Sequence, residues 1–206
     1  MARMLRTKFS AEMDFDIKRL GTNAGGLMIG TIETTEQATM QTLQFLLQRP
    51  ELLQQAKNAA TLEEPAEFDG IVWEALRFVP ISPYMFRQTS TDYIIAKGTD
   101  RETVTPAATN VLALTQSAMF DAKAFFDPEE FRPGRNWYHY FTFGYGGHEC
   151  LGKYVGMVMI PDRSVDCAAS WAQGEGRDRV RGTHAQVVSA ELDCLAAWRR
   201  GWVVNG

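Results

Sequence analysis

The chain has 206 residues, of which 45% are hydrophobic and 22% charged, a composition typical of a globular protein with one domain or two small ones. Its formal net charge of -4 provides no basic surface, so we expect no nucleic-acid partner. No apolar run is long enough to cross a membrane, and the basic N-terminus lacks the apolar segment of a secretory signal.

The first third of the chain is predicted to be helical. Apolar residues at helical spacing from about Ala11 to Gln48 predict one long helix, interrupted or loosened by the glycines within residues 25–30. Pro50 suits the first turn of a second helix, RPELLQQAKNAA. A third helix, EFDGIVWEALRFV, is predicted to stop at Pro80.

The middle of the chain loses the helical period over residues 83–113. YIIAKGT and NVLALTQ predict short strands, with turns at Lys97-Gly98 and Pro106. A proline-punctuated loop with aromatic anchors is predicted over residues 118–136, and WYHYFTF is predicted to be a strand or extended. CLGKYVGMVMI predicts an apolar helix that ends near Pro161.

The composition changes after Pro161. No phenylalanine or lysine follows it, and arginine, glycine and alanine dominate, although HAQVVSAELDCLAAWRRGW has an amphipathic helical pattern. We therefore predict two parts, residues 1–161 and an atypical tail over residues 162–206. A shifted reading frame or an unrelated joined segment would explain the tail.

One glycine-rich stretch, FTFGYGGHECLGKYVG, allows three interpretations: a phosphate cradle, a metal–thiolate site, or a tight turn with a buried structural cysteine. The phosphate cradle is the weakest. A P-loop needs a Ser or Thr hydroxyl for its magnesium ion where this chain has Tyr154, and the run before the loop is a poor buried strand.

A metal–thiolate site makes better use of the same residues. Cys150 at the start of a helix would have its thiolate favoured by the positive helix end, and neighbouring glycines would let a flat group approach the backbone. A lone sulfur ligand does not suit structural zinc, which takes four ligands, but it suits an iron already held by a macrocycle. The three cysteines of the chain form no CxxC pair, which favours a reducing, cytoplasmic compartment.

The pattern F-x-x-G-x-H-x-C-x-G resembles the haem-binding signature of the cytochrome P-450 family. Three further stretches resemble the family in the expected order: GTIETT from Gly30, EALR from Glu74, and FDPEEFRPGR from Phe126. Together the similar stretches cover roughly residues 12–160.

This resemblance implies a mainly α fold with a minor β component, namely the C-terminal haem-binding part of the family's fold, truncated. It implies haem b as cofactor, with Cys150 as the iron ligand and Phe143 beside the sulfur. Arg87 and His148 match positions that contact the haem propionates. Further residues that the resemblance assigns to the site are two glycines that give clearance, Gly144 and Gly152, and an acid–alcohol pair that delivers protons, Glu33 and Thr34. Residues 79–86 would line the substrate pocket.

Glu74 and Arg77 are three residues apart, so on a helix they share a face and can pair, although an exposed pair would contribute little stability. In the family the pair is buried and has a third partner, usually an arginine. Here that position holds Glu130, and either Arg132 or Arg135 could replace the arginine.

The resemblance implies a monooxygenase that hydroxylates a small apolar substrate with dioxygen and two electrons from a separate redox partner, a ferredoxin or flavin reductase. Two alternatives stay open: a haem-thiolate enzyme that uses peroxide or isomerises its substrate, and a non-catalytic fragment that needs a second chain. Family members are much longer, and the sequence that precedes the long central helix in them has no counterpart here.

Overall fold

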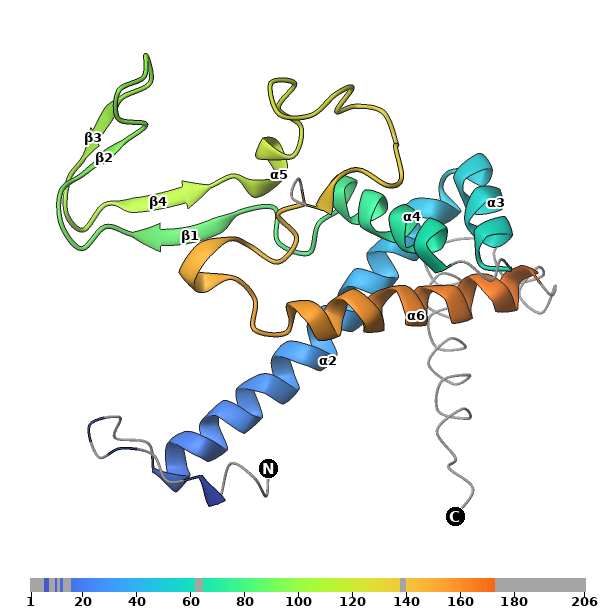
Figure 1. Ribbon diagram of the computed structural model, residues 1–206, viewed down its shortest axis with the longest axis horizontal. Coiled ribbons are helices and arrows are strands. Elements are labelled where there is room, and N and C mark those ends of the chain that lie inside the picture. The colour runs from blue at the N-terminus through green and yellow to red at the C-terminus, as the bar shows by residue number, and fades with distance from the viewer. Residues whose placement is uncertain are drawn as a thin grey trace. The chain divides into compact units, whose positions relative to one another are not determined.

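The computed structural model describes residues 6–7, 10, 12, 16–61, 65–137 and 140–172. These residues form two compact units, which we describe separately. One unit takes the described residues of 44–150, and the other takes those before residue 44 and after residue 150. The architecture is mainly helical with small β-ladders (Figure 1), as the sequence predicted.

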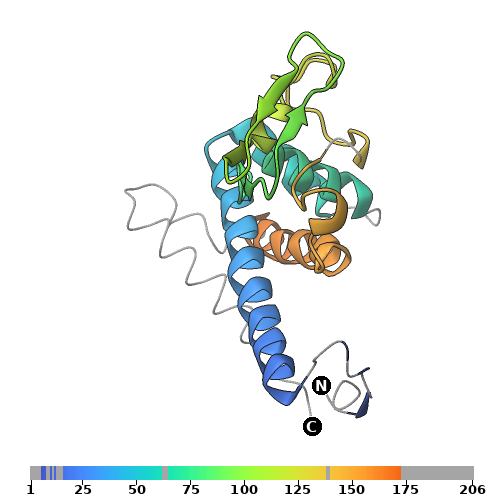
Figure 2. The same ribbon diagram turned by 90° about the vertical axis from the view of Figure 1, so that its left-hand side faces the viewer.

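The long predicted helix is α2, Ile17–Leu47, and it is not interrupted at its glycines. Figure 2 draws it as one unbroken coil. A Cβ added at Gly25, Gly26 or Gly30 would touch nothing within 4 Å, so no packing depends on their small size. The prediction of a loosened segment was wrong: the helix continues through the glycines although most residues from 21 to 34 are exposed, because each glycine costs only about 1 kcal/mol relative to alanine. The buried residues of the helix are Leu20, Thr35, Ala38, Thr39, Thr42, Leu43, Phe45 and Leu46.

Two shorter helices of the residue 44–150 unit confirm the sequence prediction. Helix α3, Pro50–Ala59, has a proline in its first turn, an acidic residue near its start and Lys57 near its end, as the helix dipole favours. Helix α4, Pro65–Phe78, packs against α3 (Figure 1). Eight of its residues are buried, and they include a charged pair: Phe68, Ile71, Val72, Trp73, Glu74, Ala75, Leu76 and Arg77.

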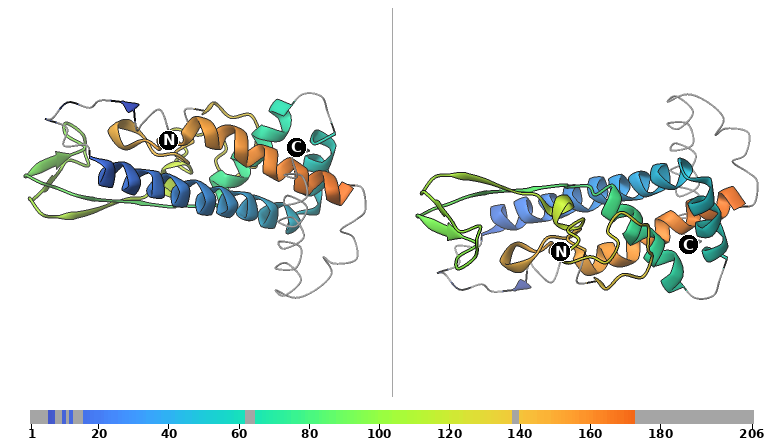
Figure 3. Two further views of the ribbon diagram at one scale, coloured as in Figure 1. Left: turned by 90° about the horizontal axis from the view of Figure 1, so that it is seen from below. Right: turned by 90° about the horizontal axis from the view of Figure 1, so that it is seen from above.

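Four short strands form two nested antiparallel ladders. Strands β1, Met85–Gln88, and β4, Asn110–Ala113, pair with Phe86 opposite Leu112. The chain between β1 and β4 contains the second ladder. Its strands β2, Tyr93–Ile95, and β3, Thr103–Thr105, pair with Ile94 opposite Val104. The inner ladder continues from the outer one as a two-stranded arm (Figures 1 and 3). The sequence predicted β2 and β4, whereas β1 and β3 were missed.

Irregular chain and short helices follow β4. Helix α5, Thr115–Ala118, precedes the predicted proline-rich loop, which has no regular structure. The strand predicted over residues 137–143 is not found in its described part: Trp137 is helical, Tyr140 and Phe141 are irregular and Phe143 lies in a turn. The positive φ of Gly144 reverses the chain there, because such a backbone conformation is open chiefly to glycine.

Helix α6, Lys153–Ala172, contains Pro161 instead of ending near it. Proline removes the hydrogen bond to the Met157 carbonyl, but one buried face runs through the break at helical spacing. Residues Ile160, Ser164 and Ala168 form that face, so burial overrides the proline. Beyond Ala172 the predicted amphipathic helix and Cys194 lie outside the described residues.

Candidate functional site

The centre of the residue 44–150 unit is a buried ion pair on α4. The Arg77 guanidinium donates from Nε to Glu74 Oε2 at 3.1 Å and from Nη2 to Glu74 Oε1 at 2.8 Å. Both side chains are 0% exposed. Their spacing of three residues puts them on one helix face, and burial makes the pair a fixed point of the unit instead of a surface contact.

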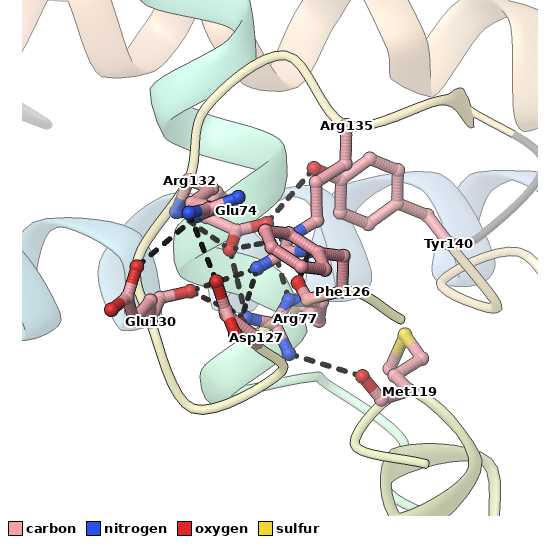
Figure 4. A network of polar contacts seen from close by, with 9 residues as sticks. All are labelled: Glu74, Arg77, Met119, Phe126, Asp127, Glu130, Arg132, Arg135 and Tyr140. Atoms are coloured by element: carbon pink, nitrogen blue, oxygen red, sulfur yellow. Dashed lines mark hydrogen bonds and ion pairs between the residues drawn. The ribbon is translucent and has the colours of Figure 1, made fainter. Parts of the chain in front are cut away.

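The proline-rich loop adds further donors to the Glu74 carboxylate (Figure 4). The Arg132 backbone N–H donates to Oε1 at 2.9 Å, and Arg135 Nε donates to the same oxygen at 3.1 Å. The Arg132 side chain instead pairs with Asp127 and Glu130 and is 42% exposed. Of the two candidates for the third partner, Arg135 is therefore the one whose guanidinium reaches Glu74.

Arg77 and Arg135 also donate to backbone carbonyls of the loop and so hold this irregular segment in one conformation. Arg77 donates to the carbonyls of Met119 at 3.0 Å and Glu130 at 3.1 Å. Arg135 donates to the carbonyls of Phe126 at 2.7 Å, Asp127 at 2.8 Å and Glu130 at 3.0 Å. Backbone acceptors that regular structure would satisfy are thus satisfied by guanidinium groups.

A glycine on α4 lets this loop come close enough. A Cβ at Gly70 would lie 3.0 Å from the Gly134 nitrogen and 3.4 Å from Pro133 Cβ. Gly134 itself has φ +82°, which a side chain would oppose. Gly70 lies one helical turn before Glu74, so the same helix face that holds the carboxylate accepts the loop.

Tyr140 completes the surroundings of Glu74 and was not found from the sequence. Its hydroxyl donates to Glu74 Oε2 at 2.9 Å, and the side chain is buried. Nothing local marks this tyrosine, because it lies 66 positions from Glu74 within a run of aromatic residues.

The pKa values of the two groups follow from this arrangement. Burial alone would raise the pKa of Glu74, but hydrogen bonds from Arg77, Arg132 and Arg135 and the charge of Arg77 outweigh it and lower the pKa. Burial, followed by the charge and hydrogen bond of Glu74, raises the pKa of Tyr140. The pair is therefore a carboxylate that accepts from a neutral phenol at neutral pH.

The cysteine loop, residues 140–150, begins at Tyr140, the residue that binds Glu74. The Cys150 N–H donates to the Phe143 carbonyl at 2.8 Å, which closes the loop, and Gly144 and Gly146 have φ of +74° and +77°. Residues Gly146–His148 form a 3-10 turn, and Cys150 is a free, exposed thiol that precedes α6 by three residues. The interpretation as a buried structural cysteine is therefore wrong for Cys150, whereas Cys167 is buried.

Aromatic side chains support the start of this loop. The Trp73 ring of α4 lies 5.0 Å from the Trp137 ring and 5.8 Å from the Phe143 ring, centroid to centroid. The Phe143 ring thus packs against α4, and Trp137 also contacts Tyr140 at 5.7 Å. Such contacts stabilise the loop beyond simple burial.

Other predicted site residues lie on separate elements. Arg87 on β1 is exposed and donates to the Phe86 carbonyl at 2.7 Å and the Met85 sulfur at 3.8 Å. A Cβ at Gly144 would lie 3.1 Å from Met85 Cε, so β1 borders the cysteine loop, in which His148 is exposed. Gly152 lies in the turn before α6.

The acid–alcohol pair belongs to α2 of the other unit. Glu33 and Thr34 are both exposed, and the Thr34 hydroxyl donates to the Gly30 carbonyl of its own helix. The backbone of α2 keeps its regular helical hydrogen bonds at these two residues.

The cysteine loop offers a single thiol, Cys150, to a metal ion. Across the described ranges, no cluster of three or more His, Cys, Asp or Glu side chains could hold a metal ion. A single exposed thiolate cannot form a tetrahedral zinc site, but it fits the axial position of an iron that has macrocycle nitrogens for its other ligands.

The described helices include none that is long and apolar enough to span a membrane.

Known proteins of one family are similar to this chain. The family model for cytochrome P450 matches residues 1–161. Cytochrome P450 NovI of Streptomyces niveus is 32% identical over 138 residues, 67% of this chain and 31% of that protein. The 20-oxo-5-O-mycaminosyltylactone 23-monooxygenase of Streptomyces fradiae is 30% identical over 138 residues, 67% of this chain and 30% of that protein.

The fold agrees with this match. The P450 heme domain of Tepidiphilus thermophilus aligns with a TM-score of 0.64 at 24% identity, covering 75% of this chain and 35% of that one. The chain spans about a third of the length of these relatives. With the family model matched over most of its residues, the chain belongs to the cytochrome P450 family, whose cofactor is haem.

Proposed function

We propose that this chain carries the haem-thiolate part of a monooxygenase, with Cys150 as the ligand of the haem iron. The observation that supports the proposal is an exposed, free thiol at the end of a glycine loop that begins at the buried Glu74 cluster. An exposed cysteine held by its own backbone bond to Phe143 is available as a ligand without any change in the loop.

Haem b would be held by groups of the residue 44–150 unit and by the adjoining turn. Arg87 and His148 are exposed, and each could donate to a propionate. Gly144 and Gly152 would give clearance, and Phe143 would pack beside the sulfur. When bound, the haem iron supplies dioxygen chemistry, to which a thiolate ligand contributes electron density.

Glu33 and Thr34 would hold and deliver protons on α2. The Thr34 hydroxyl uses its proton toward the Gly30 carbonyl, so its lone pairs stay free to accept from a water. The Glu33 carboxyl is exposed and can exchange protons with solvent. Thr34→Ala should then uncouple electron consumption from hydroxylation in a monooxygenase and leave a peroxide-using enzyme largely unaffected.

The substrate would be apolar, and the electrons would come from a ferredoxin or a flavin reductase. Phe86 and Leu112 are opposite each other on β1 and β4 and are 60% and 46% exposed. An exposed apolar pair on these strands suits an apolar molecule better than a charged one.

A second proposal is that haem binds only when a further polypeptide completes the pocket. Exposed apolar residues on α2, with Met28 at 65%, Ile29 at 62% and Ile32 at 54%, support it, because such side chains are normally covered.

The absorption spectrum of the reduced, carbon monoxide-bound protein tests both proposals. A strongly red-shifted Soret band in the chain alone is expected for thiolate-ligated haem, and Cys150→Ser should abolish it. Cys167→Ala, which removes the other cysteine among the described residues, should keep it. No haem uptake would contradict the first proposal and favour the second.

We also propose that residues 162–206 are not family sequence, in support of which the family match ends at residue 161. Reading the coding DNA beyond that codon in the other frames tests this proposal. A frame that restores family-like sequence would show a frameshift, whereas family-like sequence in the existing frame of close relatives would contradict the proposal.

A further inference from the structure

The start of the cysteine loop is attached to both members of the buried ion pair. Glu74 accepts from the Tyr140 hydroxyl at 2.9 Å. Arg77 donates to the Met119 carbonyl at 3.0 Å, and the sulfur of the same methionine accepts from the Phe141 N–H at 3.3 Å. Consecutive residues of the loop are thus connected to the carboxylate and to the guanidinium by separate routes.

The attached residues lead directly to the thiol. Phe143 follows two positions after Phe141, and its carbonyl accepts from the Cys150 N–H at 2.8 Å. Between these two residues the loop turns through Gly144, which lies beside Met85 of β1, and through Gly146, where an added Cβ would touch nothing within 4 Å. The position of Cys150 in this unit therefore depends on how firmly residues 140–143 are held.

We propose that Tyr140 and Met119 are positioning residues, through which the Glu74–Arg77 pair sets the place of the Cys150 thiolate. The proposal rests on the proposed function of Cys150 as iron ligand. Both side chains are buried, with Tyr140 8% and Met119 0% exposed. Their contacts are therefore fixed by packing and are not chance contacts of mobile surface side chains. Burial keeps water from replacing either contact, which raises the cost of losing it.

Tyr140→Phe removes only the hydroxyl and keeps the ring that packs on Trp137. Met119→Leu removes only the sulfur acceptor, keeps the backbone carbonyl that Arg77 binds, and changes the core volume little. Tyr93→Phe is the matched control, because this tyrosine is 64% exposed on β2.

The first measurement is amide hydrogen exchange, followed by NMR residue by residue in the haem-free chain. Tyr140→Phe should speed exchange at Phe141 and Cys150 on the order of ten- to a hundredfold, the effect of losing one hydrogen bond to a charged acceptor, while amides in the middle of α4 stay protected. Met119→Leu should act in the same direction, mostly at Phe141, and Tyr93→Phe should change neither site.

Unchanged exchange at Cys150 in Tyr140→Phe would overturn the proposal. Equal acceleration across α4 would overturn it as well, because that result means general destabilisation and no positioning of the loop. These outcomes need no haem, so they are distinct from a failure of the proposed function, which the carbon monoxide spectrum detects. Where the chain takes up haem, Tyr140→Phe should convert part of the red-shifted band to the form that lacks thiolate ligation.

Discussion

Replacing Glu74 by glutamine tests whether the buried carboxylate holds the residue 44–150 unit together. Glutamine keeps the shape of the side chain but removes the charge, and its NH2 group would face donors instead of accepting from them. Arg77, at 0% exposure, would then be buried without a counter-ion, and Arg135 would lose its carboxylate partner.

The expected loss follows from this burial. Removing one member of a buried ion pair costs about 3–5 kcal/mol. Since small domains have unfolding free energies of about 5–15 kcal/mol, this is a large part of the total. The other donors to the carboxylate, the Arg132 N–H and the Tyr140 hydroxyl, lie within the same cluster, so the losses should not be summed separately.

Urea unfolding followed by far-UV circular dichroism measures the change, with the slope compared between variants. Glu129→Gln is the matched control, because Glu129 is exposed in the same loop and should shift the unfolding free energy by no more than about 0.5 kcal/mol. A Glu74→Gln protein within about 1 kcal/mol of the unchanged chain would refute the idea that this carboxylate is the fixed point of the unit.

The other predictions use the same unfolding measurement. Gly70→Ala should destabilise by about 1–3 kcal/mol, because its Cβ would lie 3.0 Å from loop backbone, whereas Gly21→Ala, with nothing within 4 Å, should stabilise by up to about 1 kcal/mol. Arg135→Lys should destabilise more than Arg132→Lys, because only the former loses a guanidinium hydrogen bond to Glu74; equal effects would contradict this assignment. The lowered pKa of Glu74 makes its contribution to stability fully present above its unfolded pKa and lost as pH falls through the folded pKa, so unfolding free energies of the unchanged chain and Glu74→Gln should converge in acid.

Local patterns predicted the parts of this fold that depend on neighbouring residues. Helices α3 and α4 follow from Pro50, from Pro80 and from periodic apolar residues, and the pairing of Glu74 with Arg77 follows from their spacing. The family membership followed from short motifs whose order along the chain is itself informative, and the comparisons confirm it.

What the sequence did not predict is decided by tertiary contacts. Burial carried α6 through Pro161, against local propensity. Arg132 and Arg135 could not be told apart because both follow the same loop motif, and only the closed loop directs one guanidinium inward. Tyr140 was missed because a phenol that binds a distant carboxylate has no local pattern.

The donors around Glu74 also set how this unit must fold. The Arg132, Arg135 and Tyr140 groups are separated from Glu74 by 58, 61 and 66 positions along the chain. Bringing segments this distant together costs roughly 4 kcal/mol of chain entropy, and the cost is incurred once for all three because they arrive on one closed segment. The first of these contacts therefore bears the entropy cost of closing the chain, and the next two add little to that cost. We expect the three contacts to form together, in a late step of folding, after α4 has formed.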